Sequence, residues 1–173
     1  DPFKTNFNLK EYKALISRRC KNEPFAYLFN KKEFYNRDFK VGPGVLIPRP
    51  ETEFLIEMVL EQQQNTQFKN IVDICCGSGI IGITLFKEIK CDATMIDISP
   101  DALHWAKMNI KLHNAEDNIS LIQQDILNSS LEFKQPNLCV TINPPYISPE
   151  DLKTLESDVI DYEPHLALDG GSQ

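Results

Sequence analysis

Four short apolar runs separated by helical segments are the feature that most constrains the fold. They cover residues 71 to 75, 93 to 98, 119 to 122 and 138 to 142. Strands that alternate with helices form a parallel sheet, because each connecting helix packs back onto the sheet. We therefore predict an α/β fold with a doubly wound, mainly parallel sheet.

A short helix and a β-hairpin are predicted before this core. Apolar residues recur at helical spacing from Leu9 to Cys20, next to basic residues. Between residues 33 and 47, β-prone stretches are interrupted by Gly42-Pro43-Gly44, which predicts a hairpin that turns at these glycines.

Two further helices have recognisable ends or faces. One is expected from Pro50 to about Gln63, since acidic residues lie in its first turn. Another should begin at Ser99, whose side chain can cap it, with Pro100 at its first position. The buried stripe of the first helix is predicted to contain Leu55, Met58 and Val59.

Composition limits the classes of protein to consider. With 173 residues, 42% of them hydrophobic and 25% charged, the chain resembles an ordinary globular protein. Acidic residues outnumber basic ones, 25 to 18, so the net charge of -7 disfavours stable nucleic-acid binding. The five cysteines show no paired spacing, which predicts reduced thiols, no metal site and a cytoplasmic location. No apolar run is long enough for a membrane span.

A nucleoside site is predicted where the first two strands end. The run 71 to 75 leads into Cys76-Gly77-Ser78-Gly79, whose small residues let the backbone approach a ligand. Asp97 follows 18 residues after Gly79, at the end of the second strand, where a carboxylate can accept both ribose hydroxyls. Type and spacing together indicate an adenosine-like ligand.

Three neighbouring residues have two interpretations each. Gly82 completes a G-x-G-x-x-G pattern, but it can equally allow close packing of a helix on the sheet. Asp73 either faces the ammonium group of a cofactor or anchors the glycine loop. Asp125, after the third strand, either accepts the exocyclic amine of an adenine, with Ile126 against the ring, or belongs to a plain surface loop.

The reacting site is predicted at Asn143-Pro144-Pro145-Tyr146, directly after the fourth strand. Two prolines end the strand and fix a rigid turn that presents carbonyl acceptors at the edge where ligands bind in open α/β sheets. Asn143 adds an amide oxygen and Tyr146 a flat face with a polar tip. Such a turn suits a planar NH2 group, either an amide or an amino-purine. Because these nitrogens are weak nucleophiles, the site must act by orientation and charge stabilisation.

Several motifs together resemble the HemK/PrmC family of release-factor glutamine methyltransferases, within the class I S-adenosylmethionine-dependent methyltransferases. The Ile-Pro-Arg-Pro-Glu-Thr-Glu run distinguishes this family from other methyltransferases. The motifs are Glu23-Pro24 with Tyr27, Val45 to Glu53, the glycine loop, Asp97-Ile98-Ser99, Asn143 to Tyr146, and Glu163-Pro164 followed by Ala167-Leu168 and Gly170-Gly171.

The resemblance implies a cofactor, a substrate and a division of the residues. The cofactor is S-adenosylmethionine, and the substrate is the glutamine of a Gly-Gly-Gln loop in a peptide chain release factor, methylated at N5. Substrate contacts are implied for Asn143 to Tyr146 and for Arg49, near the active-site entrance. The cofactor contacts that the resemblance implies are Cys75, Cys76, Gly77, Ser78, Gly79, Asp97, Ile126 and Asn143. Asp73 and Asp125 are added to these expected contacts from their places at the strand ends alone.

The resemblance also implies a domain organisation. Residues 1–32 would be the remnant of an N-terminal helical substrate-binding domain, residues 33–50 a β-hairpin linker, and residues 51–173 a Rossmann-like methyltransferase core that is incomplete at its C-terminus. Cys75 occupies the place of the first loop glycine of the family, and Ile126 that of a residue that is often aromatic. Both departures are expected to affect cofactor affinity and not the chemistry.

Three other functions fit parts of the sequence. An adenine-amino methyltransferase of DNA or RNA uses a similar turn, but the acidic charge and the segment 45 to 53 argue against it. A non-catalytic cofactor-binding interaction module would have no need of an intact Asn143 to Tyr146 turn. A nicotinamide-dependent oxidoreductase leaves the two prolines of that turn unexplained.

Overall fold

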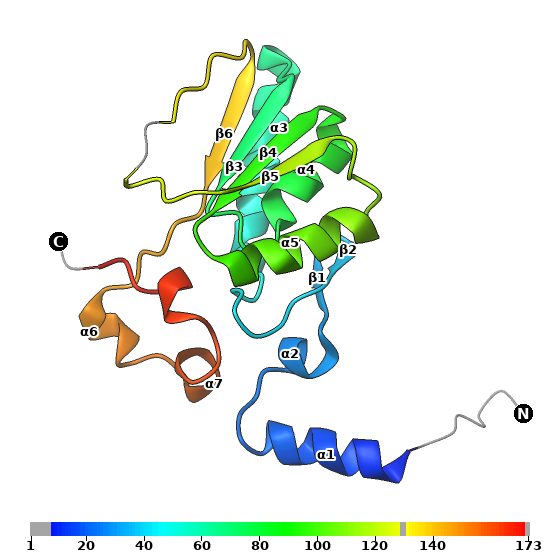
Figure 1. Cartoon of the computed structure of the whole chain (residues 1–173), viewed down its shortest axis with the longest axis vertical. Coiled ribbons are helices and arrows are strands. Elements are labelled where there is room, and N and C mark those ends of the chain that lie inside the picture. The colour runs from blue at the N-terminus through cyan, green and yellow to red at the C-terminus, as the bar shows by residue number, and fades with distance from the viewer. Residues whose placement is uncertain (1–7, 129–130, 172–173) are drawn as a thin grey trace, which may run out of the picture.

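The computed structural model describes residues 8–128 and 131–171; the outermost residues of the predicted domains 1–32 and 51–173 lie outside these ranges. The elements are arranged as in Figure 1. In chain order they are α1 (Leu9–Arg19), α2 (Phe25–Phe29), β1 (Lys32–Phe34), β2 (Arg37–Phe39), the 3-10 helix η1 (Pro50–Thr52), α3 (Glu53–Thr66), β3 (Asn70–Ile74), α4 (Ile80–Ile89), β4 (Asp92–Asp97), α5 (Pro100–Leu112), β5 (Ile119–Gln123), β6 (Leu138–Ile142), α6 (Pro149–Leu152), α7 (Ser157–Ile160) and the 3-10 helix η2 (His165–Ala167).

The predicted parallel sheet is confirmed. Its four strands lie in the order β5-β4-β3-β6, and every neighbouring pair is parallel. In the register, Ile74 lies opposite Ile96 on one side and Ile142 on the other. The carboxyl ends of the strands therefore meet at one edge of the sheet, as the binding-site prediction requires.

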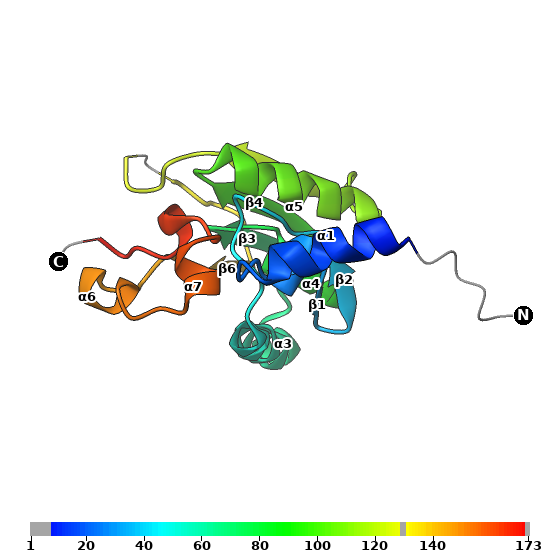
Figure 2. The ribbon, with the colours of Figure 1, turned by 90° about the horizontal axis from the view of Figure 1, so that it is seen from below.

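Helices α3, α4 and α5 cover one face of the sheet. The chain moves from β3 to β4 to β5 in one direction, and right-handed crossovers place their helices on the same face when the direction is constant. In Figure 2, α4 lies between α3 and α5. The core between these helices and the sheet contains fully buried Ile56, Ile83, Leu85 and Met95.

After β5 the chain returns across the sheet, and β6 pairs with the free side of β3. The strand order therefore reverses direction at the boundary between β3 and β6. In open α/β sheets, ligands bind outside the carboxyl ends of the strands at such a reversal. On the face opposite α4, buried Val72, Ile74 and Ile96 contact apolar residues that follow β5 and precede β6. The reversal therefore positions the candidate site.

The hairpin turns at a different place from the predicted one. Strands β1 and β2 are antiparallel, and the turn is Tyr35-Asn36, both with positive φ (48° and 55°). Two such residues form the type I′ turn, whose twist matches that of paired strands. Gly42 and Gly44 serve packing instead, since a Cβ on Gly42 would come within 2.2 Å of the Trp105 ring. The prediction of a turn at Gly42-Pro43-Gly44 was wrong.

The helix after Pro50 is present, but one residue of its predicted stripe is not buried. Its buried residue is Ile56, with Leu55 and Val59 partly buried beside it, whereas Met58 is 67% exposed. Residues two positions apart on a helix lie about 200° apart, so burial of Ile56 turns Met58 to solvent. In α5, the Ser99 side chain accepts a hydrogen bond from the Ala102 amide, and Pro100 is the first residue, as predicted.

Helix α1 confirms the predicted N-terminal helix and lies apart from the sheet (Figure 1). None of the residues within its bounds is buried, and its neighbour is α2. In the described ranges, no helix has the length and apolar character to cross a membrane.

Candidate methyl-transfer site

A cavity of about 470 Å³ lies at the carboxyl ends of the four parallel strands. Its size is that of an ordinary small-molecule site. Each strand contributes the residues that follow it, and two further walls come from residues between 44 and 52 and between 164 and 171. The cavity includes most of the predicted site residues, namely Arg49, Cys75, Cys76, Gly77, Ser78, Asp97, Asp125, Ile126, Asn143, Pro144 and Pro145.

The glycine loop after β3 adopts left-handed backbone conformations. Cys75, Gly77 and Gly79 have φ values of 56°, 56° and 82°. Gly79 does not line the cavity but caps the start of α4, and Gly77 lines it with its backbone. At Gly77 the loop therefore approaches the cavity through its backbone. Cys75 adopts a conformation that strongly favours glycine, at a cost of about 1–2 kcal/mol.

Asp97 holds the loop to the end of the neighbouring strand. Its Oδ2 accepts a hydrogen bond from the Gly77 amide at 2.8 Å, and its Oδ1 accepts one from the Ser99 amide at 2.9 Å. A carboxylate offers about four lone-pair positions, so two remain for a ligand. A diol that enters the cavity finds an oriented acceptor here, which fits the predicted ribose contact.

Asp73 is buried beneath the cavity and bonds to α4 and β6, not to the glycine loop at residues 76–79. It is 0% exposed and does not line the cavity. Its Oδ2 accepts a hydrogen bond from the Gly82 amide at 3.0 Å, and its Oδ1 accepts one from the Thr141 hydroxyl at 2.9 Å. Burial raises the pKa of Asp73 to about 7, against the opposing effect of these two bonds. The side chain therefore joins β3, α4 and β6 beneath the cavity.

Gly82 has the packing role that the sequence allowed. A Cβ on Gly82 would come within 2.5 Å of the Met95 Sδ atom and 3.3 Å of the Asp73 Cβ. Gly82 does not line the cavity. Helix α4 can approach strands β3 and β4 closely only because this position has no side chain.

Asp125 and Ile126 belong to the loop after β5 and line the cavity. The carboxylate of Asp125 accepts hydrogen bonds from the Leu127 amide at 2.9 Å and from the Asn128 side chain at 2.6 Å. These bonds, that of Asn128 first, lower the pKa of Asp125. Ile126 also packs against the cluster of Val72, Ile74 and Ile96.

The four residues of the turn after β6 do not all line the cavity. Asn143, Pro144 and Pro145 line the cavity, whereas Tyr146 does not line it and is 77% exposed. A side chain so exposed contributes little to folding, so its position at the rim makes it available to a ligand that enters from solvent. The turn thus combines an inner amide and two prolines with an outer aromatic ring.

The cavity thiols are not nucleophiles at neutral pH. Burial, helped by the nearby Asp97 and Asp73 carboxylates, raises the pKa of Cys75 to about 11. The pKa of Cys76 is raised further, for the same main reason. Because thiolates and not thiols attack electrophiles, the raised pKa values make Cys75 and Cys76 poor nucleophiles.

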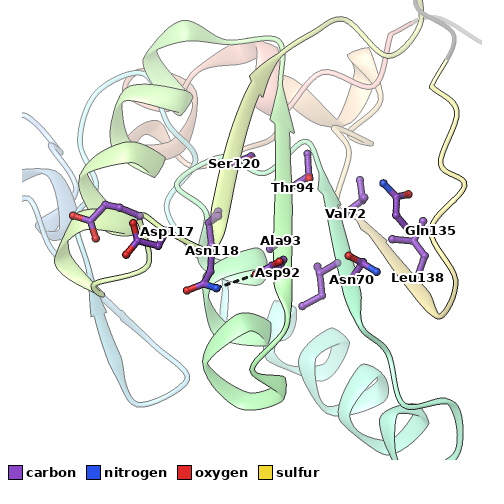
Figure 3. A pocket seen from close by; sticks show the side chains of 13 residues that line it. Asn70, Val72, Asp92, Ala93, Thr94, Asp117, Asn118, Ser120, Gln135 and Leu138 are labelled. Atoms are coloured by element: carbon purple, nitrogen blue, oxygen red, sulfur yellow. Dashed lines mark hydrogen bonds between the residues drawn. The ribbon is translucent and has the colours of Figure 1, made fainter.

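A second pocket lies at the opposite, amino-terminal edge of the sheet. It is smaller, about 160 Å³, and is lined by polar residues, including the Asn118 side chain that donates to Asp92 at 2.9 Å (Figure 3). In parallel sheets this edge is remote from the carboxyl ends where ligands bind. The larger cavity is therefore the candidate site.

Two buried polar residues support the cavity, and neither was assigned a role from the sequence, although Glu163 belongs to one of the motifs that carry the resemblance. Asn109 is 0% exposed and donates to the Ser78 carbonyl at 2.9 Å, which holds the glycine loop to α5. Glu163 is 4% exposed and binds Arg49 on the cavity wall. Asn109 shares the buried stripe of α5 with Ala102 and Ala106, and a polar residue in such a stripe was the available signal.

Two curated relatives match most of this chain. The "Release factor glutamine methyltransferase" of Clostridium acetobutylicum is 42% identical over 165 residues, which is 95% of this chain and 58% of the relative. The protein of the same name from Leptospira interrogans is 46% identical over 160 residues, 91% of this chain and 56% of the relative. The chain thus spans somewhat more than half of the length of each.

A family model also matches the segment that contains the cavity. It is described as "Methyltransferase small domain" and covers residues 50–170, well over half of the chain. The matched segment includes all four strands of the parallel sheet and the turn after β6. This chain therefore belongs to the methyltransferase small domain family.

Proposed function

We propose that the protein transfers a methyl group from S-adenosylmethionine to the N5 side-chain nitrogen of the glutamine in the Gly-Gly-Gln loop of a peptide chain release factor. The observation that carries the proposal is the Asn143-Pro144-Pro145 turn, which lines the same cavity as the glycine loop and Asp97. An acceptor site for a planar NH2 group and a nucleoside site thus share one space. The names of the two relatives support the choice of substrate.

The residues of the cavity fit S-adenosylmethionine. Asp97 keeps lone pairs for the ribose hydroxyls, and the backbone of Gly77 leaves room next to them. Asp125 offers a carboxylate to the exocyclic amine of the adenine, with Ile126 and Ile98 as apolar neighbours of the ring. When bound, the cofactor supplies an electrophilic methyl group on a sulfonium.

In this proposal, Asn143 and the Pro144 carbonyl accept the two hydrogens of the glutamine NH2 group. These bonds aim the nitrogen lone pair at the methyl carbon. Methyl transfer would form the N–C bond and break the S–C bond of the sulfonium, leaving the electron pair on the sulfur, and the nitrogen would lose a proton to solvent. From the rim of the cavity, the exposed Tyr146 ring would contact the release-factor loop that carries the glutamine. The substrate nitrogen is the nucleophile, so no thiolate nucleophile of the protein is needed.

The remaining assignments also belong to this proposal. We infer that residues 1–32 contribute to binding of the release factor, since Leu9 and Ile16 of α1 are about half exposed, at 54% and 46%. We therefore keep the proposed domains, which are a substrate-binding part at residues 1–32, a linker at residues 33–50 and a methyltransferase core at residues 51–173. A cytoplasmic location follows from the substrate, and the net charge of -7 argues against stable nucleic-acid binding.

Mass spectrometry of a release factor tests the proposal. The full-length protein is incubated with S-adenosylmethionine and the release factor, and a loop variant with alanine in place of the glutamine serves as control. We expect one added methyl group on the loop glutamine and none on the variant. If the release factor stays unmodified while an adenine-containing oligonucleotide is methylated in a parallel reaction, the proposal is refuted. Adenine-amino methylation would then be the function.

A further inference from the structure

Residues 163–170, which we call the brace, connect two walls of the cavity that are far apart in the sequence. At its first residue, the side chain of Glu163 is 1% exposed. Its Oε2 accepts a hydrogen bond from the Ile47 amide at 2.9 Å, and its Oε1 accepts one from Arg49 Nη2 at 2.7 Å. Arg49 Nη1 also donates to the Ile47 carbonyl at 3.1 Å. Glu163 and Arg49 together hold the backbone of Ile47.

The other end of the brace holds the turn after β6. The Leu168 carbonyl accepts from the Ile147 amide at 3.0 Å, and the Gly170 amide donates to the Ile147 carbonyl at 2.9 Å. A Cβ on Gly170 would lie only 3.0 Å from the Cα and carbonyl carbon of Tyr146. The backbone of the brace therefore lies directly against the turn that we assign to substrate binding.

The part between these two ends is compact and faces the cavity. Pro164, Leu166 and Ala167 line the cavity, and η2 shortens this stretch into a single turn. Near the far end, Leu168 is 3% exposed, whereas Asp169 and Gly170 are exposed and are held by the backbone bonds to Ile147. A short segment that is packed at Glu163 and Leu168 and bonded to Ile147 transmits a displacement of one end to the other, because packed protein interiors deform little.

We propose that Glu163 is a positioning residue for methyl transfer. Glu163 does not line the cavity, whereas Arg49 does, as do the brace residues Pro164, Leu166, Ala167, Asp169 and Gly170. Through Arg49 and the brace, it fixes the distance between the wall at Ile47 and the Asn143 to Tyr146 turn, and so aligns the glutamine nitrogen with the methyl group. This inference rests on the proposed function. Misplacement of reacting groups by about 1 Å costs about 100-fold in rate, so a small movement of the turn has a large effect.

The variant Glu163→Gln tests the position of the carboxylate with minimal change in shape. Its amide oxygen can still accept from Ile47, but its NH2 group faces the donors of Arg49, so the second bond is lost. Glu150→Gln is the matched control, since Glu150 is exposed in α6 of the same C-terminal region and its side chain does not line the cavity. Gly170→Ala disturbs the brace from its other end.

Hydrogen exchange of the full-length protein gives a readout that does not depend on activity. For Glu163→Gln we expect amide exchange to rise by about 10-fold in peptides that contain residues 45–50 and also in those that contain 143–148, with β3 and β4 unchanged. The rise at 143–148 is the decisive result, because these residues do not contact Glu163 in any bond that the structure shows. Gly170→Ala should give the same rise at 143–148, and Glu150→Gln none.

Kinetics with the release factor complete the test. For both brace variants we expect kcat to fall by about 10-fold or more while the dissociation constant of S-adenosylmethionine stays within about 3-fold. Unchanged exchange at 143–148 in both variants, or a rise that extends over β3 and β4, would overturn the positioning role. So would an unchanged kcat with altered exchange. A wild-type protein that transfers no methyl group would refute the proposed function, whereas the exchange comparison would still decide whether the brace couples the two walls.

Discussion

The Oδ2 atom of Asp97 accepts a hydrogen bond from the backbone amide of Gly77 at 2.8 Å. This bond joins the end of β4 to the glycine loop after β3, so the residue expected to bind the ribose also fixes the loop beside it. Replacement of Asp97 therefore affects both the ligand and the loop, and the two effects can be measured separately.

Asp97→Ala is expected to weaken S-adenosylmethionine binding by about 10- to 100-fold, because charge-assisted hydrogen bonds to two hydroxyls are lost. Isothermal titration calorimetry measures the change. Asp92→Ala is the control, since Asp92 is exposed at the amino end of the same strand. An affinity of the Asp97 variant within about 3-fold of wild type would contradict the ribose assignment.

Cys75→Gly is expected to stabilise the protein by about 0.5–1 kcal/mol. The left-handed backbone at φ 56° strains cysteine but not glycine, and part of the gain is offset by the greater freedom of glycine in the unfolded chain. Urea unfolding followed by circular dichroism measures it. Cys76→Gly, at a buried neighbour without positive φ, should instead destabilise. Equal losses in both variants would show that the strain at Cys75 is negligible.

Gly82→Ala is expected to destabilise the protein by about 1–3 kcal/mol through overpacking against Met95. The same substitution in a Met95→Ala background should cost much less, because the clashing thioether is absent. Denaturant unfolding of the two single variants and the double variant gives the coupling energy. Strictly additive losses would mean that Gly82 is required for another reason.

Asp73 is expected to make stability depend on pH. Burial raises its folded-state pKa to about 7, whereas an unfolded carboxyl has a pKa of about 3.9. Between these values the folded state keeps a proton that the unfolded state has lost. The contribution of Asp73 to the free energy of unfolding is therefore fully present below about pH 4 and is lost as the pH rises through 7. Between these two pH values it falls by about 1.4 kcal/mol per pH unit.

The variant Asp73→Asn removes this titration. The unfolding free energy of the wild type minus that of the variant should fall steadily from pH 5 to pH 7 and then level off, as measured by urea unfolding in matched buffers. Asp92→Asn, at an exposed site, should follow the wild type. Parallel curves for wild type and Asp73→Asn would show that Asp73 is ionised throughout this range.

Tyr146→Ala is expected to separate substrate binding from folding. Because the ring is 77% exposed, its removal should change the unfolding free energy by less than about 0.5 kcal/mol. Under the proposed function, kcat/KM for the release factor should nevertheless fall by about 10-fold or more. Phe54→Ala, another exposed aromatic at 72%, is the control and should leave the kinetics unchanged. Full activity of the Tyr146 variant would remove this residue from the site.

Local patterns in the sequence were sufficient to predict the sheet and most of the cavity. Each of the four strands is an apolar run. The glycine loop and the Asn143 to Pro145 turn directly follow two of these runs, and Asp97 lies at the end of another. Parallel strands bring their carboxyl ends to one edge, so residues that are distant in the sequence become neighbours without any further information. The cap at Ser99 is equally local, because its partner is the Ala102 amide.

Other features were decided only when distant segments packed together. The hairpin turn lies at Tyr35-Asn36, and Gly42 instead packs against Trp105, a contact that no local pattern indicates. Met58 is exposed because the burial of Ile56 set the rotation of α3.

The sequence by itself determined the alternation of strands and helices and the residues at the strand ends, since hydrophobic periodicity and turn chemistry act over a few residues. Only the tertiary structure decided that Asp73 is fully buried beneath the cavity and that Glu163 holds Arg49 across 114 positions of the chain. The physical reason is desolvation: whether a carboxylate faces solvent, a ligand or a buried donor depends on which segments exclude water from it, and those segments are distant in the sequence.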